Sequence, residues 1–326
     1  MRFLAALITI SFITVPSAFA QKIQPSKRLY KNYLQAVLSI EQGDFRTGLK
    51  GLERAKKLDP ESFHIRLKKA ALHIRLGEMN EAEKELKETK KIDPERMDAS
   101  LALIFLYSYT QKEQELEEEY EEFLTKAHEL KPEEVKISEY LAQFYFYKKK
   151  FQDAIKIYEA IVTKKPTYIE GVFWLGVLYE EAGQRKEAIQ MWKRGLKIDA
   201  YHAPTLNSLG YVYAEEGMYL DEAEDMVKRA LEKEPDSGVY LDSLGWIYFK
   251  KKEYKKAEEY LKKAVELVED AVILEHLGDV YIALGKTEEA LKYYQKGFEL
   301  SPESDELKEK LEKYGPKDQI PEEKSN

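Results

Sequence analysis

Residues 271–304 read AVILEHLGDVYIALGKTEEALKYYQKGFELSPES. Apolar side chains in this stretch recur every three or four residues, which predicts two amphipathic helices. Gly285 falls between them, and glycine ends a helix at little cost because it adopts the left-handed conformation freely. The stretch therefore predicts a helical hairpin, with Leu277, Val280, Tyr281 and Leu284 on the apolar face of the first helix and Ala290, Leu291, Tyr294 and Phe298 on that of the second.

The hairpin pattern recurs along the chain with a period of about 34 residues. Prolines close the helical stretches and mark this period, at Pro60, Pro94, Pro132, Pro166, Pro235 and Pro302. The repeats follow one another without linkers, so we expect one continuous array. Its eight units are 29–62, 63–96, 97–134, 135–168, 169–202, 203–237, 238–270 and 271–304.

Small residues stand at matching places in the two helices of each unit. A glycine inside a helix costs about 1 kcal/mol relative to alanine, so its recurrence indicates a steric requirement. We infer that the paired helices approach closely at these places. In the first helix the small residues are Ala36, Ala70, Ala142, Gly176, Gly210, Gly245 and Gly278, and in the second they are Ala82, Ala154, Ala188, Ala223, Ala257 and Ala290.

The array resembles the tetratricopeptide repeat family over residues 29–304. The resemblance rests on Leu175-Gly176, Tyr179, Ala188 and Trp192, and on the corresponding residues of the later units, such as Leu277-Gly278, Tyr281, Ala290, Tyr294 and Pro302. It implies an all-α solenoid, a right-handed superhelix of about eight helical hairpins. Residues 305–314 continue the apolar stripe and are expected to form the capping helix that a solenoid end needs.

Family resemblance also implies a binding groove. Side chains at places two, five, nine, twelve and thirteen of each unit, counted from its first residue, are expected to line a concave face. In the N-terminal half this stripe is aromatic and apolar, whereas in the C-terminal half aromatic side chains alternate with acidic ones. The candidate groove residues are Tyr33, Phe105, Tyr109, Tyr147, Phe173, Asn207, Tyr211, Glu215, Asp242, Trp246, Phe249, Glu275 and Asp279.

The first twenty residues have the features of a secretory signal peptide. A basic residue, Arg2, precedes an apolar stretch, and Ala18-Phe19-Ala20 matches a small-x-small cleavage site. Cleavage would leave a short lead-in at 21–28 and a periplasmic or secreted protein, while a retained segment would act as an anchor. No cysteine follows the site, which excludes a lipid anchor there. At the other end, we expect 315–326 to be a disordered tail.

Composition and motifs argue against several classes of function. The chain of 326 residues has a net charge of −8, which is unfavourable for nucleic-acid binding, and it contains no cysteine for a thiolate nucleophile or a zinc site. The five histidines lack metal-ligand spacing, and no phosphate loop or nucleophile elbow is present. We therefore predict a protein that is not an enzyme, with no catalytic, metal or cofactor site.

Two functions remain after these exclusions. The first is a scaffold or adaptor of the bacterial cell envelope that binds segments of other proteins, with basic and apolar side chains, in the groove. This class requires no stable membrane insertion after signal cleavage. The alternative is an accessory protein that binds glycan, cell wall or exopolysaccharide through its aromatic face. The acidic run Glu113–Glu122, within the insertion at 111–122, is expected to lengthen a helix by about one turn or to serve as a second docking surface.

Overall fold

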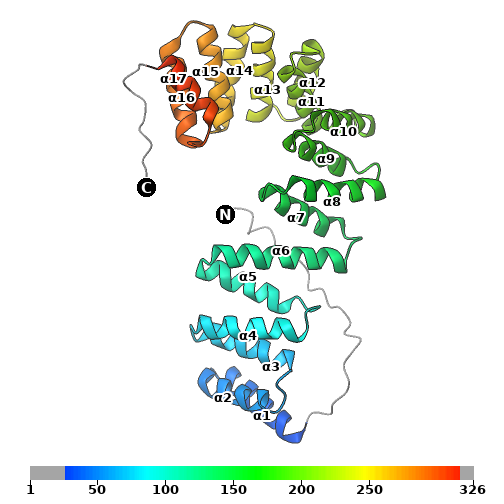
Figure 1. Ribbon diagram of the computed structural model, residues 1–326, viewed down its shortest axis with the longest axis vertical. Helices are drawn as coiled ribbons and strands as arrows, with labels where there is room; N and C mark the ends of the chain where they lie inside the picture. The colour runs from blue at the N-terminus through cyan, green and yellow to red at the C-terminus, as the bar shows by residue number, and fades with distance from the viewer. Residues whose placement is uncertain (1–25, 316–326) are drawn as a thin grey trace. The chain divides into compact units, whose positions relative to one another are not determined.

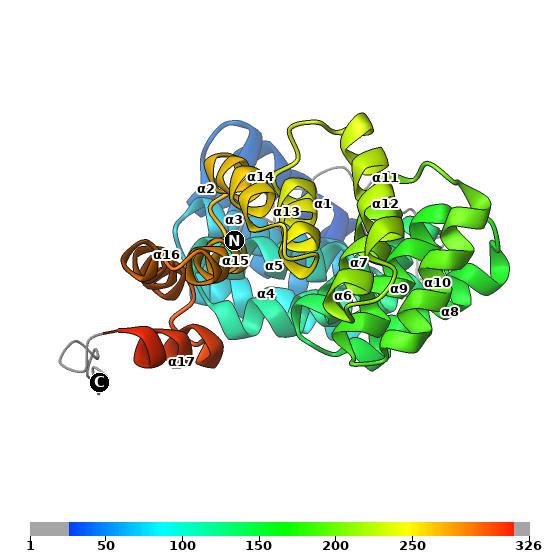
Figure 2. The same ribbon diagram turned by 90° about the horizontal axis from the view of Figure 1, so that it is seen from above.

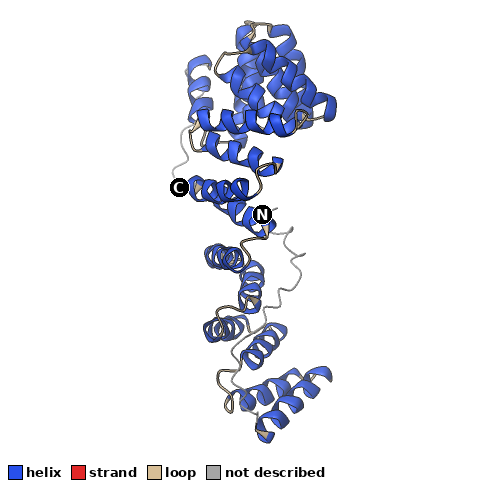
Figure 3. Ribbon diagram, turned by 90° about the vertical axis from the view of Figure 1, so that its right-hand side faces the viewer, coloured by secondary structure: helices blue, strands red, loops and turns tan. Residues whose placement is uncertain are grey.

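A computed structural model of the protein describes residues 26–315. Within this range the chain forms 17 α-helices and no strand (Figure 3). Consecutive helices pair into hairpins that follow one another in chain order (Figure 1). The prediction of an all-α solenoid with a final capping helix is thereby confirmed. The predicted signal peptide, 1–20, and most of the expected tail lie outside the described residues.

The structure divides into two compact units, which meet between residues 141 and 142. The N-terminal unit contains three hairpins, and α7 (Val135–Tyr147) crosses the division. The hairpins are formed by α1 (Lys27–Glu41) with α2 (Phe45–Lys56), α3 (Phe63–Arg75) with α4 (Met79–Ile92), and α5 (Asp98–Thr110) with α6 (Glu113–Leu130). Helix α6 has 18 residues against 14 in α4, so the insertion lengthens this helix by about one turn, as predicted.

The C-terminal unit contains the remaining helices and the largest apolar core, which runs from Ala188 to Leu307. Its last helix, α17, occupies the residues expected to form the cap and packs on α16. The helices are α8 (Phe151–Lys164), α9 (Ile169–Glu181), α10 (Arg185–Ile198), α11 (Ala203–Glu215), α12 (Leu220–Lys233), α13 (Gly238–Lys250), α14 (Tyr254–Leu267), α15 (Ala271–Ala283), α16 (Thr287–Leu300) and α17 (Asp305–Tyr314).

Small residues allow the helices of a hairpin to approach closely, as the sequence predicted. A Cβ atom at Gly245 would lie only 2.6 Å from Cγ of Leu261, and one at Gly210 would lie 2.8 Å from Cγ2 of Val227. Ala70 and Ala142 occupy the same place in other units and are fully buried. The turn glycines also behave as predicted, because Gly43, Gly77, Gly183, Gly217 and Gly285 all have φ between 65° and 81°.

The turns of the other hairpins use residues that the sequence did not single out. Gln111, Lys149 and Lys252 adopt positive φ, although they are not glycines. Such a conformation costs roughly 1–3 kcal/mol for a non-glycine residue. The helix-to-helix turn is therefore imposed by the packing of the hairpin and does not depend on a glycine.

Candidate functional site

Helices α11, α13 and α15 are the first helices of three successive hairpins, and they pack directly against one another. Side chains at the same place of each unit therefore come together. At place five the three side chains are polar and buried, and at place nine they are half-buried or buried. The residues are Asn207, Asp242 and Glu275 at place five, and Tyr211, Trp246 and Asp279 at place nine.

His276 on α15 contacts several of these side chains. Its Nδ1 is 2.9 Å from Oδ1 of Asp242, one repeat earlier on α13. The imidazole also stacks on the indole of Trp246, and the indole stacks on Phe249 with ring centroids 4.7 Å apart. Burial alone would lower the pKa of His276, but the carboxylate of Asp242, with smaller contributions from Asp279 and Glu275, raises it above the ordinary value.

The sequence predicted no role for His276, because the spacing of the five histidines does not suit a metal site. The separation between Asp242 and His276 is 34 residues, one repeat length, and this separation is the signal that could have identified the pair. Within the described part of the chain, no group of three or more histidine or acidic residues is arranged to hold a metal ion.

The acidic side chains on this surface are paired within the protein. Glu215 accepts a hydrogen bond from Nε1 of Trp246, and one of its oxygens lies 3.6 Å from Nζ of Lys250. Asp279 accepts a hydrogen bond of 2.6 Å from the hydroxyl of Tyr294. Because each carboxylate has a partner, the negative charge of these acidic side chains is largely compensated.

Lys310 of α17 supplies the remaining compensation. Its Nζ forms an ion pair with Glu275 and another, at 2.9 Å, with Asp279. Burial would lower the pKa of Lys310, but hydrogen bonds to the two carboxylates outweigh this effect and raise it, so the ammonium stays charged. The capping helix, which packs on α16 and is drawn in red in Figure 2, thus contributes a side chain to the candidate site, which the sequence did not predict.

The predicted residues of the other helices are more accessible. Phe105 and Tyr109 are one turn apart on α5, with 63% and 76% of their surface exposed, and Tyr147 at the end of α7 is 67% exposed. Tyr33 on α1 and Phe173 on α9 are half-buried. The structure therefore separates the predicted set into a buried or half-buried network on α11, α13 and α15, exposed aromatic side chains on α5 and α7, and half-buried ones on α1 and α9.

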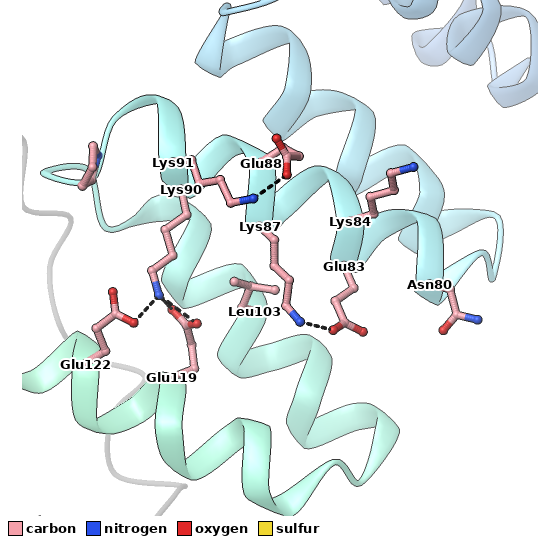
Figure 4. Close-up of a pocket in the computed structure, with 11 residues that line it drawn as sticks. Asn80, Glu83, Lys84, Lys87, Glu88, Lys90, Lys91, Leu103, Glu119 and Glu122 are labelled. Atoms are coloured by element: carbon pink, nitrogen blue, oxygen red, sulfur yellow. Dashed lines mark hydrogen bonds and ion pairs between the residues drawn. The ribbon is translucent and has the colours of Figure 1, made fainter.

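An open pocket of about 680 Å³ lies between α4 and α6 in the N-terminal unit (Figure 4). Its floor includes the buried Leu103, and its walls carry lysines from α4 and glutamates from α6. Lys90 bridges the walls, with Nζ 2.8 Å from Glu119 and 2.6 Å from Glu122. Part of the acidic run Glu113–Glu122 thus serves to pack one hairpin against the preceding one.

Comparison with known sequences agrees with the repeat geometry. Sequence models described as tetratricopeptide repeat match residues 39–104, 170–194, 239–271 and 271–304. These matches include hairpins in both compact units. The chain is a tetratricopeptide repeat protein. A search of curated proteins finds no match to its sequence.

Some solved structures are similar to this tetratricopeptide repeat protein. The crystal structure of the APC/C hetero-tetramer Cut9–Hcn1 matches with a TM-score of 0.55 and 18% identity, over 83% of this chain and 53% of that chain. A thermophilic tetratricopeptide repeat protein of Thermus thermophilus matches with a TM-score of 0.49 and 22% identity, over 55% of this chain and 98% of that one. At 18% identity, the likeness to Cut9–Hcn1 concerns the fold alone.

The tetratricopeptide repeat fold suits a scaffold for protein–protein interaction, because stacked hairpins present long, continuous surfaces. Among the described residues, none of the helices combines the length and the apolar character needed to cross a membrane.

Proposed function

We propose that this protein is an exported scaffold of the bacterial cell envelope and that it binds an apolar segment of a partner protein on the first-helix surface of its N-terminal unit. The observation that supports this proposal most is the exposure of Phe105 and Tyr109 on α5. Aromatic side chains are enriched in the buried centres of protein interfaces, and tyrosine is among the residues that supply most of the binding energy. Export is supported by the signal-peptide features of residues 1–20.

The buried network on α11, α13 and α15 is less suited to a partner. Trp246 is covered by His276 and Phe249, and Glu275 and Asp279 already bind Lys310. A partner would have to displace these contacts, which costs free energy. On the N-terminal surface the aromatic side chains are already exposed, so an apolar segment would gain contact area without displacing internal partners.

The test is photo-crosslinking in the living cell, followed by calorimetry. A photoreactive amino acid at position 109 should capture a partner protein, whereas the same amino acid at position 201 should not, since Tyr201 is similarly exposed but lies in a turn. Replacing Phe105 and Tyr109 by alanine should each cost about 2 kcal/mol in affinity for that partner. Tyr201→Ala is the matched control and should leave the affinity unchanged.

Two results would contradict the proposal. If the affinity survives both alanine substitutions, the partner binds elsewhere. If no protein is captured and the chain instead sediments with cell-wall polysaccharide in a manner that depends on Tyr109, the glycan-binding alternative is correct.

N-terminal sequencing of the exported protein tests the first twenty residues separately: Gln21 as the first residue indicates cleavage, and Met1 indicates a retained segment.

A further inference from the structure

Helix α1 carries an apolar stripe on its outer side. Tyr30, Leu34 and Leu38 are spaced four residues apart, which places them on one face of the helix. Their exposed fractions are 59%, 42% and 60%. Ala36, on the opposite face, is fully buried against α2. The stripe is therefore not part of the hairpin's own core.

In the later units the place of Leu38 is always covered. Leu38 stands at place ten, and its counterpart in the second unit, Leu72, shares an apolar cluster with Leu52 and Ala55 of the preceding hairpin. The counterparts in all seven later units are buried. They are Leu72, Leu106, Phe144, Leu178, Val212, Ile247 and Val280. At the other end of the chain α17 covers the last hairpin, with Leu307 fully buried. Among residues 26–315, no helix covers α1 in the corresponding way.

Two of the charges beside the stripe lie at equal distances from Leu34 along the helix, while a third, Lys31, has the apolar Val37 as its counterpart. Lys27 lies seven residues before Leu34, and Glu41 lies seven residues after it. Seven residues are about two helical turns, so both charges fall on the same face as Leu34. Both side chains are exposed, and neither forms an ion pair with another residue of the described range.

From this arrangement we propose that two copies of the protein pair through α1, with the helices antiparallel about a two-fold axis at Leu34. In such a pair, a residue of one copy faces the residue of the second copy that lies equally many positions from Leu34 in the opposite direction along the helix. Lys27 then faces Glu41 of the second copy, Tyr30 faces Leu38, and the two Leu34 side chains meet at the axis. Each contact away from the axis forms twice, as two-fold symmetry requires.

The symmetry favours a second copy over an unrelated partner, because the apolar spacing and the Lys27–Glu41 charges of the stripe match those of an antiparallel copy. A single pair of helices buries less surface than a standard interface, so we expect a weak, reversible dimer. Pairing would join two scaffolds and leave Phe105 and Tyr109 of both free. A partner with two binding segments would then gain affinity through linked binding.

Cysteine crosslinking of the full chain tests the axis directly. The native chain has no cysteine, so the Leu34→Cys variant has one thiol per copy. At the two-fold axis these thiols lie close enough for a disulfide. Mild oxidation should therefore yield a covalent dimer at least about tenfold faster than in Leu300→Cys, because neighbouring thiols have a high effective concentration. Leu300 on α16 is a suitable control since it is 46% exposed.

Sedimentation equilibrium tests the charge pairs. The unmodified chain should show a concentration-dependent dimer, Leu34→Glu should be monomeric, and Leu300→Glu should behave as the unmodified chain. Lys27→Glu should weaken the dimer several-fold, and the double variant Lys27→Glu with Glu41→Lys should restore it. Circular dichroism establishes that each variant is folded.

The proposal is wrong if the unmodified chain remains a monomer at about 100 μM, a concentration at which weak interfaces are populated. It is also wrong if Leu34→Cys forms a disulfide no faster than Leu300→Cys, or if the double charge reversal fails to restore a dimer that Lys27→Glu has weakened. A monomeric Leu34→Cys variant whose thiol resists alkylation would mean that residues preceding Ser26 cover the stripe instead.

Discussion

The indole of Trp246 stacks on the imidazole of His276, with ring centroids 4.0 Å apart and ring planes 16° from parallel. Trp246 belongs to α13 and His276 to α15, so the stack joins two successive hairpins. The same histidine contacts the carboxylate of Asp242, also on α13. A charged imidazolium is favoured by both neighbours, since the carboxylate is anionic and an aromatic face attracts cations.

This arrangement predicts a loss of stability at alkaline pH. Because the pKa of His276 is higher in the folded protein than in the unfolded chain, the folded state holds the proton more tightly. The stabilisation is complete below the ordinary histidine pKa, near 6.5. It is lost as the pH rises through the higher pKa that His276 has in the folded protein. Urea unfolding at a series of pH values between about 6 and 9 should show the decrease.

The control for this prediction is His276→Gln, which retains a hydrogen-bond donor toward Asp242 but does not titrate. In this variant the decrease in unfolding free energy over the same pH range should be absent. His64→Gln, at an exposed histidine, should leave the decrease in place. If the native protein and His276→Gln respond to pH alike, the His276–Asp242 contact is not the cause.

Periodicity determined the fold, while the chemistry of the candidate site depended on contacts between repeats. The small residues Gly176 and Gly278 and the turn glycine Gly285 could be placed from sequence because each unit repeats the same local rule. The pairing of Lys310 with Glu275 could not, since Lys310 belongs to a helix outside the repeat alignment. Burial of Trp246 was also missed, because place nine is exposed in α5 but covered where α11, α13 and α15 pack together.

The close approach at Gly278 predicts that alanine there destabilises the protein. A Cβ atom would lie 2.6 Å from Cδ1 of Tyr294, whose ring is fully buried and whose hydroxyl donates a hydrogen bond to Asp279. Displacement of the ring should cost about 1–3 kcal/mol, more than the gain in helix propensity. Chemical denaturation should show this loss for Gly278→Ala.

Gly195→Ala is the matched control, since Gly195 is also helical and buried. There a Cβ atom would meet only the side-chain ends of Ile169 and Thr205, at 3.3 Å, and these can move slightly. The expected change in unfolding free energy is therefore much smaller. A similar loss in both variants would show that backbone effects of glycine, and not the contact with Tyr294, decide the result.

Three glutamates on second helices predict sensitivity to acid. Glu83, Glu224 and Glu258 each bind a lysine at the turn of the next hairpin, and for Glu224 the distance to Lys251 is 2.6 Å. Burial raises the pKa of each carboxyl, but hydrogen bonds from lysines outweigh it and lower the pKa to about 2. The stabilisation is fully present above the glutamate pKa of the unfolded chain, about 4.5. It is lost as the pH falls from there to about 2, the pKa in the folded protein.

Thermal unfolding between about pH 2 and 6 checks this prediction. Glu224→Gln should unfold at a lower temperature than the native protein at about pH 6, and the difference should shrink toward about pH 2, where Glu224 becomes protonated in the folded state as well. Glu232→Gln, at an exposed position on the same helix, should have no such effect. A difference that stays constant with pH would mean that Glu224 acts through packing and not through its charge.

The capping helix α17 predicts different outcomes for two truncations. Leu307 is buried against α16, and Tyr314 stacks near Tyr294 with ring centroids 6.4 Å apart. Removal of residues 305–326 would expose this apolar face and leave Glu275 and Asp279 without Lys310, so we expect aggregation and a lower unfolding temperature. Removal of residues 316–326 alone retains α17, so it should change neither the solubility nor the unfolding temperature. Equal solubility of the two truncations would show that α17 is not needed as a cap.

Lys310→Met separates the two contributions of the capping helix, because it keeps the apolar cover and removes only the charge. The carboxylates of Glu275 and Asp279 would then lose their cation in a largely buried setting, and we expect a loss of about 3–5 kcal/mol in unfolding free energy. Lys313→Met, at an exposed lysine of the same helix, is the matched control and should unfold like the native protein. The unfolding midpoint and the soluble yield of both variants provide the measurement. If Lys310→Met is as stable as Lys313→Met, the ion pairs of Lys310 contribute little, and α17 stabilises the last hairpin through its apolar face alone.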